Sequence, residues 1–207
     1  CFFPMRPGEF CLSSAEAHPF RCQDIMPFQG ARRLGPSDDL MQATFVVLTF
    51  TTQKNAVKGK KVRHARSGHP MVCPVLAAAH RLTTLRQQHA APSAPLHRHC
   101  NNSQPFEVTS TQISTVLKAA TREMGHHCGL SESLIDARSL RPGGAMALLN
   151  SNIDTDLIRL FGRWQSDAMF RCLQTQAAPT VSRFARSMIH GGKITLLPQD
   201  QPPEQSP

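Results

Sequence analysis

The chain has no tyrosine among its 207 residues and only one tryptophan. Without a phenolic oxygen, no residue of this sequence can act as a tyrosine nucleophile or proton donor. No run of about 18 apolar residues is present, so we expect no membrane-spanning segment. The seven cysteines are odd in number and form no Cys-x-x-Cys pair. A disulfide framework is therefore not expected, and a reducing, intracellular compartment suits the chain better.

The sequence contains fewer lysines and fewer acidic residues than arginines. The 23 basic residues comprise 17 arginines and 6 lysines, against 14 acidic residues, and the formal net charge is +9. The planar guanidinium presents a fork of donors that suits bidentate contact with phosphate. The charge therefore favours a nucleic-acid partner, while composition alone leaves an ordinary basic protein as the alternative.

A length of 207 residues fits one domain with a core of its own. We expect this domain over residues 1–190 and a disordered tail over residues 191–207, which are rich in proline and glutamine. The chain begins with Cys1 inside a segment that we expect to be helical. We therefore expect the sequence to be a fragment of a longer protein or the translation of a larger or broken reading frame.

Three segments predict β-strands. Residues 43–51 are dense in β-branched and aromatic residues, residues 24–28 form a weaker candidate, and residues 60–64 form a basic one. A polar turn over residues 54–59 separates the last two strands. The sequence therefore predicts a small three-stranded antiparallel sheet, preceded over residues 1–12 by the end of a buried helix.

Most of the remaining chain predicts helices. Pro74 suits the first turn of one helix, and Thr109 or Ser110 caps the next, whereas residues 90–106 have the composition of a loop. A further helix is expected from about residue 139 to 149. The helical spacing is typical of an apolar face turned inward, at Ile113, Val116, Leu117, Ala120 and Met124.

Three more helices are expected beyond residue 150. Asp154 caps the first of them, which should turn Leu157, Ile158 and Phe161 inward. A short helix carries Cys172, and the last spans about residues 180–190. The fold class expected from all these segments is α+β and mainly helical.

Three arginine motifs carry the functional signal. They are Arg6-Pro7-Gly8-Glu9, Arg138-Ser139-Leu140-Arg141 and Gly162-Arg163-Trp164, and Cys172 follows Arg163 by nine positions. Together with a lysine in the expected hairpin, their order resembles the catalytic domain of tyrosine recombinases, the phage-integrase family. Residues 137–176 are especially similar to recombinases of eukaryotic mobile elements, and the likeness extends over about residues 2–190.

The resemblance implies a tyrosine-recombinase catalytic-domain-like fold and a function in DNA recombination and DNA integration. It implies double-stranded DNA as the partner, a nuclear location, and a site that uses no metal and no cofactor. The family's N-terminal core-binding domain is not expected in this chain, so DNA affinity should be lower and strongly dependent on salt.

The family's site residues map onto this sequence position by position. Arg6, Arg141 and Arg163 match positions that bind the DNA phosphate, and Lys54 matches the hairpin lysine that protonates the leaving oxygen. Arg138 occupies the position of a proton-transferring histidine. Such cations would stabilise the charge that phosphoryl transfer places on the phosphate oxygens.

The decisive departure is Cys172, which stands where the family has its nucleophilic tyrosine. A phenol of pKa about 10 is an adequate leaving group in the second step of strand exchange. A thiol ionises more easily, with a pKa of about 8.5, but sulfur is a poor partner for phosphorus in diester exchange. We therefore expect strand cleavage to be impaired. For the hairpin lysine that protonates the leaving oxygen, Lys58 is a weaker candidate than Lys54.

Several alternatives stay open. The chain is either a recombinase relic or a non-catalytic DNA-binding or structural protein that keeps a basic groove. Histidines near Cys100 and Cys128 suggest a zinc site as an alternative. Neighbouring residues such as His126 and His127 rarely bind one tetrahedral ion together, and the sequence has no Cys-x-x-Cys pair, so we do not expect zinc. The apolar stripe over residues 181–189 covers this domain's own core or forms a homo-oligomer through the C-terminal helix.

Overall fold

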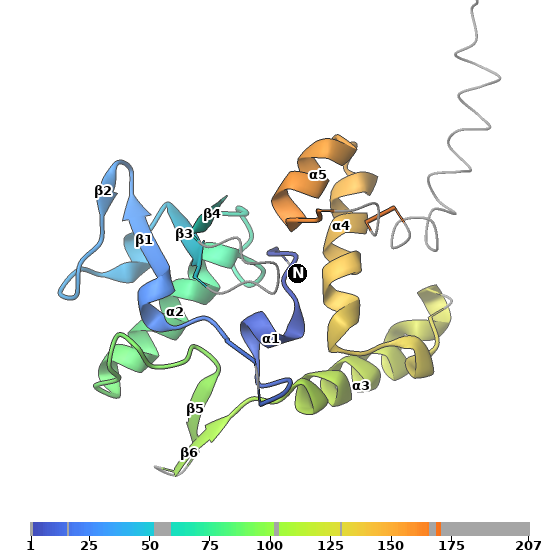
Figure 1. Ribbon diagram of the computed structural model, residues 1–207, viewed down its shortest axis with the longest axis horizontal. Helices are drawn as coiled ribbons and strands as arrows, with labels where there is room; N and C mark the ends of the chain where they lie inside the picture. The colour runs from blue at the N-terminus through green and yellow to red at the C-terminus, as the bar shows by residue number, and fades with distance from the viewer. Residues whose placement is uncertain are drawn as a thin grey trace, which may run out of the picture.

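The structure is a computed structural model, and it describes residues 2–15, 17–51, 59–101, 104–128, 130–165 and 169–170. Within these residues the chain is a mixed α+β protein with a small antiparallel sheet. Figure 1 shows the sheet and helix α2 on one side and helices α3, α4 and α5 on the other, with α1 between them. The N-terminal segment is thus the place where the two parts meet.

The sheet has four strands in the order β2-β1-β3-β4, and every neighbouring pair is antiparallel. Three of them, β1 (Ile25–Gln29), β3 (Phe45–Phe50) and β4 (Lys60–Ala65), lie where the sequence predicts strands. The predicted number of three strands is wrong, because β2 (Arg32–Arg33) turns back onto β1. The turn uses Gly30 at a φ of 55°, and a strand of two residues is too short to show an alternating pattern.

The main core lies between the sheet and α2 (Pro74–Gln87), which begins at the predicted Pro74. Strand β3 alternates buried and half-buried side chains, and it turns Val46, Leu48 and Phe50 toward the core. Helix α2 contributes Val75, Ala79 and Leu82 to the same cluster. Burial of each large apolar side chain contributes about 1.5–3 kcal/mol to folding.

The expected loop over residues 90–106 is wrong in part. Strands β5 (Arg98–Asn101) and β6 (Gln104–Glu107) pair antiparallel in a separate two-stranded sheet. All the side chains of β6 are exposed. A strand exposed on both faces does not need the alternation of apolar and polar residues by which a half-buried strand is recognised in a sequence.

The N-terminal helix is shorter than expected. Residues 1–12 predict the end of a buried helix, but α1 is a single turn, Pro7–Phe10. Pro4 and Pro7 oppose a longer helix, since proline lacks the N–H donor that a helix interior needs and restricts the residue before it.

The helical part contains α3 (Ser110–Cys128), α4 (Leu140–Asn150) and α5 (Thr155–Gly162), as the sequence predicts. Asp154 caps α5, accepting hydrogen bonds from the backbone N–H groups of Asp156 and Leu157 at 2.8 and 3.3 Å. A second small core lies between α4 and α5 and is built from Ala145, Met146, Ile158 and Met169.

The inward faces predicted for α3 and α5 are wrong in part. Ile158 is fully buried, but Leu157 is exposed. On α3, Val116, Ala120 and Met124 are exposed as well. Helical periodicity identifies which side chains share a face, but it does not say whether another element covers that face.

Among the described helices, none is both long and apolar enough to cross a membrane. The predicted helix carrying Cys172, the helix over residues 180–190 and the tail over residues 191–207 lie outside the described residues.

Candidate functional site

A buried ion pair joins the first and third arginine motifs. The Nη2 atom of Arg163 donates a hydrogen bond of 2.7 Å to Oε2 of Glu9. Only 3% of the Arg163 side chain and 9% of the Glu9 side chain are exposed. Removing one partner of such a pair costs about 3–5 kcal/mol, because the other charge stays buried without compensation. The contact therefore fixes α1 against the end of α5.

Local geometry directs Arg163 into this position. Arg163 is the C-cap of α5 and adopts the left-handed conformation, at a φ of 57°. Its guanidinium carbon lies 3.4 Å from the centre of the Phe50 ring, the last residue of β3. Burial lowers the pKa of the guanidinium, while the Glu9 carboxylate acts in the opposite direction. Arginine still keeps its proton at neutral pH, so the pair is ionic.

Arg6 shares the same carboxylate. The backbone N–H of Arg6 donates to Oε2 of Glu9 at 2.8 Å, and Nη1 lies 3.7 Å from Oε1. About a third of the Arg6 side chain is exposed, so its fork can still reach an outside anion. Two guanidinium groups surround one carboxylate, so the three side chains together carry a net positive charge.

Arg141, in the first turn of α4, reaches the same region from the helical side. Its Nη2 donates to the carbonyl oxygen of Gly162 at 2.6 Å, and its guanidinium lies 4.4 Å from the Trp164 ring. A Cβ atom on Gly162 would fall 1.3 Å from the Trp164 ring. Only glycine therefore lets Trp164 fold back beneath Arg141, which gives the Gly-Arg-Trp motif its structural reason. We call Arg6, Glu9, Arg141 and Arg163 the arginine cluster.

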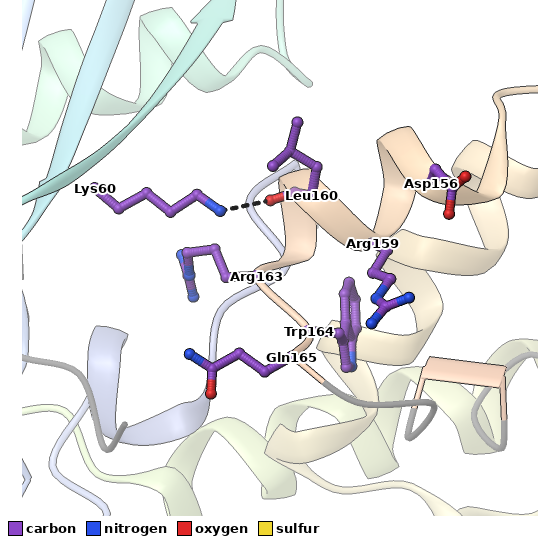
Figure 2. A pocket seen from close by; sticks show the side chains of 7 residues that line it. All are labelled: Lys60, Asp156, Arg159, Leu160, Arg163, Trp164 and Gln165. Carbon is purple, nitrogen blue, oxygen red and sulfur yellow. Dashed lines mark hydrogen bonds between the residues drawn. The ribbon is translucent and has the colours of Figure 1, made fainter. Parts of the chain in front are cut away.

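A basic pocket opens beside the arginine cluster, with a volume of about 280 Å³. Figure 2 shows it between the start of β4 and the end of α5. The pocket is lined by Lys60, Asp156, Arg159, Leu160, Arg163, Trp164 and Gln165. Three cationic side chains and one carboxylate line the pocket, so it favours an anion.

Lys60 is the cation that connects the sheet to this pocket. It is the first residue of β4, and its Nζ donates to the carbonyl oxygen of Leu160 at 3.1 Å (Figure 2). A cation at this place also compensates the negative end of the α5 dipole. The sequence predictions missed Lys60 and Arg159. The available signals were the basic strand at residues 60–64 and an arginine in the last turn before Gly162.

The structure brings together only part of the predicted site. Arg6 and Arg163 share the carboxylate of Glu9, and Arg141 contacts the backbone of Gly162, the residue before Arg163. Lys54 and Cys172, predicted as the leaving-group acid and the nucleophile position, lie outside the described residues.

Arg138 takes a different place from Arg141. Its Nε and Nη2 donate to Oδ2 of Asp136 at 2.9 and 2.6 Å, and this pairing lowers the pKa of the Asp136 carboxyl. It lines a separate cleft of about 530 Å³, together with Ser114 and Lys118 of α3. Arg138 and Arg141 therefore make different contacts, although only three positions separate them. Arg138 belongs to a 3₁₀ turn, and only Arg141 belongs to α4.

Within the described residues, no group of three or more His, Cys, Asp or Glu side chains is gathered as a metal ion would require. Comparisons of the chain with protein-family models, with curated proteins and with solved structures gave no match.

Proposed function

We propose that the chain binds double-stranded DNA through the arginine cluster and the basic pocket beside it. It would do so as a tyrosine-recombinase-like protein of DNA recombination and DNA integration whose strand cleavage is impaired. The supporting observation is the contact between Arg163 and Glu9, which joins two motifs on which the resemblance depends. The formal charge of +9 supports the same partner.

Each cation in the cluster has a distinct part in this proposal. Arg6 presents a half-exposed fork to a DNA phosphate, and Lys60 and Arg159 add charge from the pocket. Arg163 donates to Glu9, so it does not contact the phosphate directly. It contributes positive charge to the site and holds α1 in place. Arg141 holds the backbone of Gly162 and the Trp164 ring, and thereby orients the end of α5.

Strand cleavage needs a nucleophile as well as cations. Cys172 occupies the nucleophile's position in the sequence, and a thiolate does not sustain reversible exchange with a phosphodiester. The proposal is therefore DNA binding of the recombinase type, in the nucleus, without turnover.

A non-catalytic DNA-binding or structural role is the second candidate. It is favoured by the pairing of Arg163 with Glu9, because a carboxylate occupies donors that a catalytic clamp would direct at phosphate. The two candidates differ in whether the site could still promote cleavage if it had a tyrosine.

Binding of a duplex oligonucleotide at several salt concentrations tests the shared claim. We expect Lys60→Gln and Arg159→Gln each to weaken binding about tenfold and to lower the slope of log K against log salt by about 1, as the loss of one phosphate contact does. Arg33→Gln removes the same charge from exposed β2, at the opposite edge of the sheet from β4, and is the matched control. If all three variants changed the affinity and the salt slope equally, the proposal that DNA binds at this pocket would be contradicted.

Covalent capture on a nicked duplex separates the two candidates. The native chain should form no protein–DNA adduct. If Cys172→Tyr forms one, the site keeps a recombinase arrangement. If Cys172→Tyr binds DNA and forms none, the non-catalytic role is correct.

A further inference from the structure

A cleft of about 400 Å³ lies between the sheet and the end of α2. It is lined by residues of β1, β2 and α2 and of the segments that adjoin them. We call it the β2–α2 cleft. The residues of the arginine cluster and of the basic pocket all lie outside its lining, so it is distinct from the proposed DNA site.

The buried side chains of the β2–α2 cleft are apolar. Leu34, Leu82 and Leu85 line it, and their exposed fractions are 3, 6 and 2%. Ile25 and Pro27 of β1 extend the same surface. A ligand that covers these side chains gains free energy in proportion to the apolar area that it removes from water.

Two arginines bring positive charge to this apolar surface. Arg33 reaches it from β2 and Arg86 from the last turn of α2, and none of the described residues that line the cleft is acidic. Near Cys22, which also lines the cleft, the charges of Arg81 and Asp24 act in opposite directions and offset each other. The lining therefore selects for negative charge.

Strand β2 explains why Arg33 is available to a ligand. Successive side chains of a strand point to opposite faces, so the two adjacent arginines of β2 have different surroundings. Arg32 pairs with Asp38 at 3.1 Å, whereas Arg33 lines the cleft. Arg33 is exposed, and within the described part of the chain its side chain makes no ion pair.

The nearest carboxylate to Arg86 is already occupied by other donors. Nη1 of Arg86 donates to the backbone carbonyl oxygen of Asp38 at 3.3 Å. The Asp38 carboxylate accepts from the backbone N–H of Gly35 at 2.6 Å and from the Arg32 guanidinium, and these bonds lower its pKa. One carboxylate thus faces the guanidinium groups of Arg32 and Arg86, and Arg33 adds a third, so positive charge is in excess.

We propose that the β2–α2 cleft binds a small carboxylic acid with an apolar body of one or two rings. The body covers the three leucines, and the carboxylate accepts hydrogen bonds from Arg33 and Arg86. A guanidinium matches a carboxylate in shape and charge, and an apolar cleft of this volume with a few charged groups is typical of small-molecule sites. The inference does not depend on the proposed function, since the two sites share no lining residue.

Two probes with the same ring system test the proposal on the native chain. We expect 2-naphthoate to bind about tenfold more tightly than 2-naphthol, because only the carboxylate is charged at pH 7. Calorimetry measures both affinities, and the NMR shifts of the methyl groups of Leu34, Leu82 and Leu85 locate the site. Equal affinities, tighter binding of 2-naphthol, no binding of 2-naphthoate up to its solubility limit, or shifts confined to methyl groups outside the cleft would each overturn the proposal.

Charge variants assign the preference to the two arginines. Arg33→Gln and Arg86→Gln should each weaken the binding of 2-naphthoate about fivefold and leave that of 2-naphthol unchanged. Arg122→Gln removes the same charge from an exposed position of α3 and is the control. Because Arg33 is exposed, its variant should fold as the native chain does. An Arg33→Gln variant that binds 2-naphthoate as tightly as the control does would overturn the assignment.

Discussion

At the scale of single residues, Glu9 is the group on which the site depends most. Its carboxylate accepts hydrogen bonds from the Arg6 backbone and from the Arg163 guanidinium. The side chains of Glu9 and Arg163 are both buried. The Arg6-x-x-Glu9 spacing is visible in the sequence, but the partner of Glu9 is 154 positions away. Local patterns cannot identify such a contact, because only the tertiary fold brings the two segments together.

We predict that Glu9→Gln destabilises the protein by about 3–5 kcal/mol, since it leaves the Arg163 charge buried without a counterion. Urea unfolding followed by circular dichroism measures this change. Glu132→Gln, which breaks the exposed pair with Arg122, is the control and should change stability by less than about 1 kcal/mol. A Glu9→Gln variant as stable as the control would mean that the buried pair contributes nothing.

Two glycines in neighbouring helices should respond in opposite directions. Gly162→Ala places a methyl group inside the Trp164 ring, so Trp164 must move and stability should fall by about 1–3 kcal/mol. Gly143→Ala, in α4, meets nothing within 4 Å and should stabilise the chain by about 0.5–1 kcal/mol. Thermal unfolding of the two variants decides the matter, and a shift of the same sign in both would contradict the packing of Trp164.

At the scale of elements, the sequence predicts what depends on local pattern. Strand β3 was predicted from its β-branched and aromatic residues, α2 from Pro74 and α5 from the cap at Asp154, and all three elements are confirmed. Strand β6 was missed because its exposed side chains show no alternation. Helix α3 was found, but the exposure of Val116 was not, because burial depends on neighbours that the local sequence does not contain.

Strand β4 carries a histidine that links it to two other segments. Nε2 of His64 lies 2.6 Å from the carbonyl oxygen of Phe2, and its ring makes edge contacts with Phe3 and Phe161. Burial lowers the pKa of His64, and the hydrogen bond to Phe2 opposes the shift without reversing it. The folded protein therefore binds the proton of His64 less readily than the unfolded chain does.

This shift predicts a pH dependence of stability. Above pH about 6.5 the imidazole is neutral in both states and has no effect. As the pH falls below that value, the unfolded chain takes up the proton first, so stability decreases until the folded pKa is passed. His64→Phe keeps the ring and should flatten this decrease between pH 7 and 5, measured by unfolding free energies. An unchanged pH profile, the same as that of the exposed-site variant His80→Gln, would contradict the burial of His64.

At the scale of the whole molecule, the N-terminal segment connects the sheet to the helical part. Glu9 reaches the end of α5, and the segment from Phe2 lies against β4 (Figure 1). Lys60 adds a direct contact from β4 to α5. The cationic residues of the cluster and pocket therefore come from both parts, so the proposed DNA site would need both parts assembled.

The central claim is that Arg6 contacts a backbone phosphate from this assembled site. Arg6→Gln suits its test, because Glu9 accepts from the Arg6 backbone and the side chain is only a distant partner at 3.7 Å. The decisive measurement is the affinity of Arg6→Gln for duplex DNA from 50 to 200 mM salt, beside Arg33→Gln. We predict about tenfold weaker binding and a salt slope lower by about 1 for Arg6→Gln than for the control. The same affinity and slope in both variants would contradict the claim.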